Sequence, residues 1–228
     1  MKKLYAVRRL FSSLRAFLLD TVYPKGAVCS VCGAFSDGRI LCPACRRSLE
    51  QDGWSHAWDW RDLEPGLRAY SLRLHDGIPR SLVLSLKHQA NAAAAKELAS
   101  LIQPVPAGVS FPPDTVITWV PMPENRRRDR CVDHGRCLAE AAAAQLGFPC
   151  MPLMVRTSGG RRQATLNRAG RERNLKGAFA PLRPVHTPVL LVDDVLTTGT
   201  TARRCAAVLR QAGAPEISVL TFTRSKYI

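Results

Sequence analysis

The chain has 228 residues, of which 46% are hydrophobic and 22% charged, and this balance excludes an intrinsically disordered protein. Its length suits one α/β domain with a small appendage, and its formal net charge of +15 favours polyanionic partners such as nucleic acid, anionic lipid or phosphorylated small molecules. No apolar stretch reaches the length of a transmembrane helix and no signal peptide is recognisable, so we expect a cytoplasmic protein with no integral membrane segment.

Residues 1–24 predict a basic amphipathic helix. Apolar side chains recur at helical spacing from Val7 to Leu18, arginines occupy the other faces, and Pro24 ends the pattern. We favour a helix that packs its apolar face on the rest of the protein. The alternative is a helix that binds a partner or a membrane surface, which would make the protein peripheral at the inner face of the membrane.

Four of the eight cysteines predict a small Cys₄ zinc ribbon over residues 25–60. They form two C-x-x-C pairs, Cys29 with Cys32 and Cys42 with Cys45. Two such pairs complete a tetrahedral thiolate site with no open position, which indicates structural Zn²⁺; iron on the same sulfurs, or a redox pair, is the alternative. Gly33 and Gly38 would help the turns. The other cysteines are expected to pack as small buried hydrophobic residues.

Three tryptophans, Trp54, Trp58 and Trp60, follow the cysteine pairs. They suit either the stacking of bases or the packing of a hydrophobic junction, and we favour packing.

Residues 61–228 predict an α/β domain in which strands alternate with helices. Strands are expected at 69–74, 116–120, 151–155, 189–192 and 217–223. Helices are expected around 82–86 and at 91–102, 133–146 and 202–212, with Gly147 ending the third of these.

Two basic segments lie within this domain. The first follows the strand at 116–120 and includes Arg126, Arg127 and Arg130, at the sheet edge where ligands of open α/β folds bind. The second, residues 156–176, has no core pattern and predicts a basic lid that includes Arg162, Arg171 and Arg173. The alternative for either segment is a solvated charged loop.

Residues 189–201 carry the most specific signal in the chain. An apolar strand leads into Asp193 and Asp194, a polar turn and a helix, and these parts together form an anion site. The two carboxylates would repel phosphate, so their expected partners are neutral hydroxyls or a divalent cation. The alternative is an ordinary strand and helix capped near Thr200 or Thr201.

The same residues resemble the phosphoribosyl pyrophosphate (PRPP) signature of type I phosphoribosyltransferases. The resemblance implies that Asp193 and Asp194 hold the ribose 2′- and 3′-hydroxyls, with Mg²⁺ accompanying PRPP. It also implies that Val195 binds PRPP and that a loop of Thr197, Thr198, Gly199, Thr200 and Thr201 wraps the 5′-phosphate. The fold it implies is a parallel sheet flanked by helices.

Most of the chain resembles the ComF family of double-zinc-ribbon, GntX-like proteins. The cysteine pairs, the Val-Pro-Met-Pro run with its arginines, the basic stretch ending at Phe179 and the PRPP stretch all match. One departure is Arg130-Cys131-Val132-Asp133-His134, where the family usually has a glycine-containing run. The resemblance implies a role in natural competence and DNA uptake, with competence proteins as partners.

The sequence therefore leaves three hypotheses for the function of the protein. The first is transfer of ribose 5-phosphate from PRPP to an unidentified acceptor. The second is binding of single-stranded DNA as an accessory of competence, for which the basic charge and tryptophans are suited. The third is a regulator that binds PRPP without turnover.

Overall fold

The computed structural model describes residues 27–51, 58–89, 92–122, 132–157 and 178–226. They belong to two compact units, residues 1–52 and 53–228, which we treat separately. The amphipathic helix predicted over residues 1–24 lies outside the described residues. No helix in the described part of the chain is long and apolar enough to cross a membrane.

The described part of the first unit contains the two cysteine pairs and helix α2 (Pro43–Gln51), whose first turn carries Cys45. Gly33 and Gly38 adopt φ values of 74° and 75°, so both make the left-handed turns expected of them. The buried apolar side chains include Ile40, Leu41 and Leu49. Because this core is small, the cysteine cluster is well placed to add stability.

The second unit is built on a five-stranded sheet with the order β1-β2-β7-β6-β3. Its strands are β1 (Asp59–Glu64), β2 (Leu67–Leu74), β7 (Ile217–Arg224), β6 (Val189–Leu196) and β3 (Val116–Trp119). The last four run parallel, and β1 pairs antiparallel with β2 at one edge. This arrangement confirms the expected α/β class with a mostly parallel sheet.

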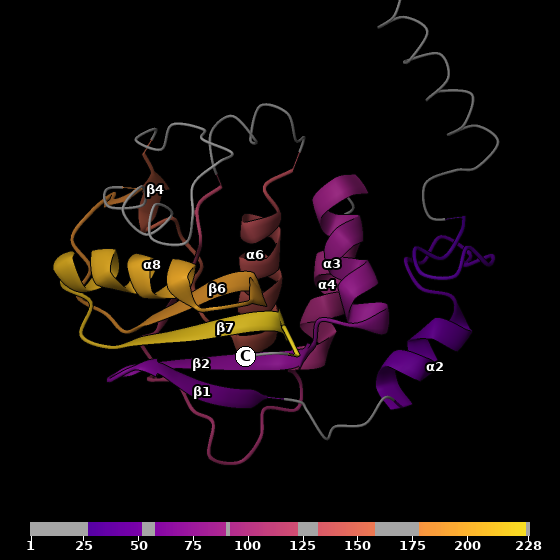
Figure 1. The fold of residues 1–228 in the computed structure, drawn as a ribbon, viewed down its shortest axis with the longest axis horizontal. Helices are drawn as coiled ribbons and strands as arrows, with labels where there is room; N and C mark the ends of the chain where they lie inside the picture. The colour runs from indigo at the N-terminus through magenta and orange to yellow at the C-terminus, as the bar shows by residue number, and fades with distance from the viewer. Residues whose placement is uncertain (1–26, 52–57, 90–91, 123–131, 158–177, 227–228) are drawn as a thin grey trace, which may run out of the picture. The chain divides into compact units, whose positions relative to one another are not determined.

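Helices cover both faces of the sheet (Figure 1). On one face, α8 (Thr200–Gln211) shares a core with Leu191 and Val219, and it contacts a second, two-stranded sheet of β4 (Met154–Arg156) and β5 (Phe179–Pro181). On the other face, α3 (Gly77–Gln89) packs on β2 and β7, and α6 (His134–Leu146) packs on β6 and β3. Helix α4 (Ala93–Ala99) contacts both of these helices.

Several predicted boundaries shift in the structure. Helix α6 begins at the cap Asp133 and ends at left-handed Gly147, as expected. The helix expected at 91–102 is shorter: α4 is followed by the 3₁₀ turn η2 (Ser100–Ile102). The strand expected at 151–155 begins only at Met154; just before it, Cys150 forms an isolated parallel bridge with Ile117, and Met151 donates its N–H to the carbonyl of Ile117.

Strand β1 was not predicted. Its sequence, Asp-Trp-Arg-Asp-Leu-Glu, is mostly charged, and Leu63 is buried while its neighbours along the strand are half-buried or exposed. An edge strand with one partner needs little apolar surface, so its hydrophobic pattern is weak.

The packing interpretation of the tryptophans holds for Trp58, which is 3% exposed. Its ring packs against Tyr70 and Phe111, and its Nε1 donates to the carbonyl oxygen of Ile102 at 3.0 Å. Trp60 is 54% exposed, and Trp54 lies outside the described residues. Among the cysteines outside the pairs, Cys205 is buried, Cys137 and Cys150 are half-buried, and Cys131 is not described.

Candidate functional site

The two aspartates lie inside β6, near its carboxyl end. We expected the strand to end at residue 192, but its pairing with β7 continues through Asp193 opposite Thr221 to Leu196 opposite Arg224. This end of the parallel sheet is the edge at which open α/β folds bind their ligands.

Their position within a strand sends the two carboxylates to opposite faces of the sheet, because successive side chains of a strand alternate. Leu191, two residues earlier, packs in the core that includes Cys205 of α8, so Asp193 belongs to the α8 face. Asp194 belongs to the opposite face, where side chains from α3 and α6 reach it.

Asp194 is buried and already paired. Its Oδ2 lies 2.7 Å from Nζ of Lys87 on α3 and 3.3 Å from Nε2 of His134 at the start of α6. Burial disfavours the charged carboxylate, but the hydrogen bond with His134 and the charge of Lys87 outweigh that cost and lower the pKa of Asp194. Asp194 is therefore an ionised carboxylate held between two cationic or hydrogen-bonding partners.

Asp193 is half-buried and has a different environment. Burial, followed by the negative charge of Asp194, raises the pKa of Asp193 to about 7. The N–H of Asp194, which donates to Asp193 Oδ1 at 2.9 Å, and the charge of Lys87 both oppose this rise. Near neutral pH this carboxyl can therefore gain or lose a proton.

A polar chain connects the edge of the sheet to this pair. Nδ1 of His75, just after β2, lies 2.9 Å from Oγ1 of Thr223, which donates to the backbone carbonyl of Asp194 at 3.2 Å. Burial, then the charges of Lys87 and Arg80, lowers the pKa of His75. Residues from β2, β7, β6, α3 and α6 thus converge on the carboxyl edge.

The turn between β6 and α8 has the geometry of an anion loop. Gly199 is the N-cap of α8, with φ 75°, and because glycine has no side chain it cannot cap the helix itself. The hydroxyls of Thr198 and Thr200 lie 2.9 Å apart, and Thr197, Thr198 and Thr201 are exposed. Backbone N–H groups, hydroxyls and the positive end of the helix dipole therefore face one small region.

Arginines hold the backbone of this turn. Nη2 of Arg61, on β1, donates to the carbonyl of Thr197 at 3.0 Å. Arg203, on α8, donates from Nη1 to the carbonyl of Thr198 at 3.0 Å and from Nε to the carbonyl of Leu63 at 3.1 Å. The unpredicted strand β1 is therefore part of the support for the loop.

The four paired cysteines of the first unit form a cluster that can hold a metal ion such as zinc. The sulfurs of Cys29, Cys32, Cys42 and Cys45 all lie within 4.8 Å of one another. Those of Cys32 and Cys42 are 3.6 Å apart, against about 3.8 Å for two thiolates on one tetrahedral Zn²⁺ with Zn–S bonds of ~2.3 Å. Although burial opposes it, hydrogen bonds from the backbone at Cys32 and Cys42 lower the pKa of Cys29 to about 6, whereas burial and the neighbouring thiols raise the pKa of Cys45.

The predicted basic segments lie largely outside the described residues. These include Arg126, Arg127 and Arg130 of the loop after β3, and Arg162, Arg171 and Arg173 of the lid. The lid segment leaves from β4 and returns into β5, which pair antiparallel with Arg156 opposite Phe179 and contact α8.

Sequence reasoning missed Lys87, His134 and His75 as members of the site. A single lysine near the end of an amphipathic helix carries no local signal. His134 was noted only as part of a departure from the ComF pattern. The one usable clue was position, since His75 follows a strand expected to end at residue 74 and so lies at the carboxyl edge.

The chain is similar in sequence to proteins named for DNA utilization. No protein-family model matches this chain. The DNA utilization protein YhgH of Salmonella typhi is 28% identical over 216 residues, covering 87% of this chain and 90% of that protein. YhgH of Escherichia coli O157:H7 is 28% identical over 217 residues, with the same coverage.

Solved structures similar to this chain include phosphoribosyltransferases. An allosteric regulatory enzyme of purine biosynthesis is 27% identical, with a TM-score of 0.41; the match covers 57% of this chain but only 26% of that enzyme. Adenine phosphoribosyl transferase from Trypanosoma brucei is 12% identical, with a TM-score of 0.40 and coverage of 73% and 74%.

Proposed function

We propose that this protein binds PRPP with Mg²⁺ at the carboxyl edge of its sheet and serves DNA utilisation. The observation that carries the proposal is a run of Asp193, Asp194, a threonine turn and the start of α8, whose N-cap Gly199 has no side chain, all at one edge of a parallel sheet. Few ligands need hydroxyl acceptors and a phosphate site so close together, and a ribose 5-phosphate does.

The two ends of the ligand would be held by different chemistry. The 5′-phosphate would accept hydrogen bonds from the backbone and hydroxyls of residues 197–201, and the ribose diol would donate to the carboxylates. Because Lys87 and His134 already engage Asp194, Asp193 is the carboxylate more readily available to a hydroxyl. Mg²⁺ would supply neutralisation of the pyrophosphate charge, with Asp193 as the carboxylate available to it at this edge.

Turnover would transfer the phosphoribosyl group to an acceptor that is still to be identified. The bond from the anomeric carbon to the pyrophosphate oxygen breaks, and pyrophosphate leaves with the electron pair. A new bond forms to the acceptor, which loses its proton. The arginines after β3 and in the lid segment, Arg126, Arg127, Arg130, Arg162, Arg171 and Arg173, are the candidates for stabilising the departing charge.

The proposed role in DNA utilisation rests on the YhgH relatives, which are named DNA utilization proteins. A formal net charge of +15 suits a protein that works beside polyanions. Natural competence, with competence proteins as partners, is the setting that the resemblance to the ComF family suggests.

Calorimetric titration of PRPP with Mg²⁺ into the wild type and into the Asp193→Asn/Asp194→Asn double variant tests the proposal. We expect binding to the wild type and at least tenfold weaker binding to the double variant, since neutral amides are poorer acceptors and poorer Mg²⁺ ligands. Equal affinity of the two proteins would remove the assigned role of the aspartates. A folded wild type that binds no PRPP would refute the proposal.

Single-stranded DNA binding without turnover is the second candidate, favoured by the charge and by the name of the YhgH relatives. Its affinity should fall steeply as salt rises, because each neutralised phosphate releases counterions. PRPP binding held by diol and Mg²⁺ contacts should fall less. A regulator that senses PRPP would bind it but release no pyrophosphate with any base or amine acceptor.

A further inference from the structure

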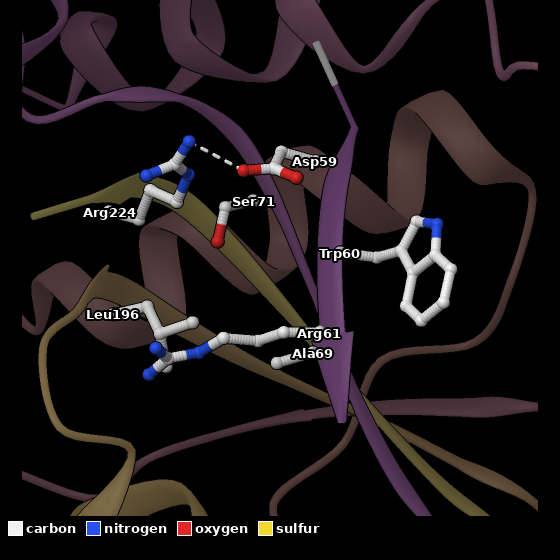
Figure 2. A pocket seen from close by; sticks show the side chains of 7 residues that line it. All are labelled: Asp59, Trp60, Arg61, Ala69, Ser71, Leu196 and Arg224. Atoms are coloured by element: carbon white, nitrogen blue, oxygen red, sulfur yellow. Dashed lines mark ion pairs between the residues drawn. The ribbon is translucent and has the colours of Figure 1, made fainter. Parts of the chain in front are cut away.

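A cavity of about 210 Å³ lies beside β1, near the ends of β6 and β7 (Figure 2). Its lining comes from four strands: Asp59, Trp60, Arg61, Ala69, Ser71, Leu196 and Arg224. It is separate from the carboxylates of Asp193 and Asp194, neither of which lines it.

The charged groups of this cavity are unevenly balanced. Arg224 forms an ion pair with Asp59, which neutralises it. Arg61 donates from Nη2 to the carbonyl of Thr197, an uncharged partner, so its positive charge has no paired carboxylate among the lining residues. The Nε of Arg61 is buried and has no hydrogen-bond partner among the described residues.

The charges around Arg61 favour an added anion. Burial is the largest cause that lowers the pKa of Arg61, and repulsion from the nearby guanidinium groups of Arg203 and Arg224 adds to it, while the negative charge of Asp59 opposes the shift. An anion in the cavity would accept a hydrogen bond from the buried Nε of Arg61. Its negative charge would also reduce the repulsion between the arginines.

The remaining lining narrows the class of anion. The Trp60 ring lies across β1 from the two arginines in Figure 2, and the guanidinium of Arg68 stacks on one face of it, 4.1 Å from the ring centroid, so that face is not available to a base. The volume is also below the roughly 300 Å³ at which pockets for drug-sized ligands begin. This small volume suits a small anion and not a nucleotide.

We propose that this cavity is a binding site for a small phosphoryl anion, inorganic phosphate or pyrophosphate, held by Arg61 and by Arg224. Asp59 competes with the anion for Arg224, so it acts as a built-in counter-charge that weakens binding. The site is distinct from the proposed PRPP site and stands without it. Because Arg61 also holds the carbonyl of Thr197, occupation of the cavity would pull on the loop at its first residue.

Titration calorimetry of phosphate and of pyrophosphate into the full chain tests this site. The loop of residues 197–201 could bind the same anions, so the titrations are made in a Thr201→Asp background, where the new carboxylate repels anions from the start of α8. In that background, we expect Arg61→Gln to weaken anion binding tenfold or more. Asp59→Asn should strengthen it roughly threefold or more, because it frees Arg224 and removes a negative charge.

Arg68→Gln is the matched control, since it also removes one arginine from the β1–β2 edge, but one that pairs with Asp62 outside the cavity. It should leave the affinity within about twofold. If Arg61→Gln fails to fold, Arg61→Lys, which keeps the charge, together with Asp59→Asn decides the question. Loss of anion binding in the Thr201→Asp background would overturn the proposal. An anion affinity that changes neither in Arg61→Gln nor in Asp59→Asn would also overturn it.

Discussion

Nζ of Lys87 on α3 lies 2.7 Å from Oδ2 of Asp194 on β6, and this ion pair ties a helix to the candidate site. Both groups are largely removed from water, with side chains 25% and 11% exposed. A charge in such a place is costly once its partner is removed. The pair therefore contributes to the stability of the fold as well as to the charge of the site.

We expect Lys87→Met to lower the free energy of unfolding by about 2 kcal/mol, because it leaves the Asp194 carboxylate with the more distant His134 as its partner among the described residues. Urea denaturation at neutral pH measures the change. Lys96→Met, at an exposed position on α4, is the control and should cost less than about 0.5 kcal/mol. Losses that simply add in the Lys87→Met/Asp194→Asn double variant would contradict the coupling.

The raised pKa of Asp193 predicts a dependence of stability on pH. A carboxyl whose pKa rises from 3.8 to about 7 on folding binds its proton more tightly in the folded chain, so it stabilises the fold below pH 4. That contribution is lost as pH rises to about 7. Relative to the wild type, Asp193→Asn should therefore gain up to about 4 kcal/mol in unfolding free energy between pH 4 and pH 7.

Denaturation curves of both proteins across this range measure the difference. Asp114→Asn removes an exposed aspartate and controls for the loss of one negative charge from the chain. A gap between Asp193→Asn and the wild type that stays constant with pH would show that Asp193 has no raised pKa in the folded protein.

Much of the fold was predictable from sequence because it depends on local patterns. The apolar run of β6, the Asp133 cap and the Gly147 end of α6 each contain their own signal. Strand β1 has no such signal. Its place depends on pairing with β2 and on the contacts of Arg61 and Leu63 with the loop at Thr197 and Gly199, more than a hundred residues later in the sequence.

The candidate site was predictable in part for the same reason. Asp193, Asp194 and the threonine turn are contiguous in sequence, so their pattern could be recognised. Lys87 and His134 reach Asp194 from two separate helices, and only the packing of those helices on the sheet brings them together. The alternation of side chains along β6 also separates two carboxylates that are neighbours in sequence.

Gly199 is a position where we expect any side chain to be harmful. Its φ is 75°, and a Cβ there would stand 2.9 Å from Cδ2 of Leu63. Gly199→Ala should destabilise the protein by about 2–4 kcal/mol, the sum of left-handed strain and overpacking. It should also displace the loop and weaken PRPP binding.

Gly147 provides a matched control for that substitution. Its φ is 77°, but nothing lies within 4 Å of a Cβ built there, so Gly147→Ala tests the backbone strain without the clash. We expect about 1–2 kcal/mol for Gly147→Ala, measured by thermal or urea denaturation. Equal losses at the two glycines would mean that Leu63 moves aside without cost.

The cysteine cluster predicts a metal requirement for the first unit. Replacing Cys29 and Cys42 by serine removes one ligand from each C-x-x-C pair, so the bound ion should be lost. The described core of this unit includes few large apolar side chains, chiefly Ile40, Leu41 and Leu49, so loss of the metal should unfold it. Elemental analysis of the purified protein measures the metal and distinguishes zinc from iron.

Cys137→Ser and Cys150→Ser are the controls, because these thiols are half-buried and belong to the second unit, outside the cluster. They should leave the metal content unchanged. Proteolysis should cut the Cys29/Cys42 variant within residues 27–51 while the second unit, with its own sheet and core, resists. A variant that keeps a full equivalent of metal would refute the four-thiolate site, and a metal-free variant that resists cleavage would refute its structural role.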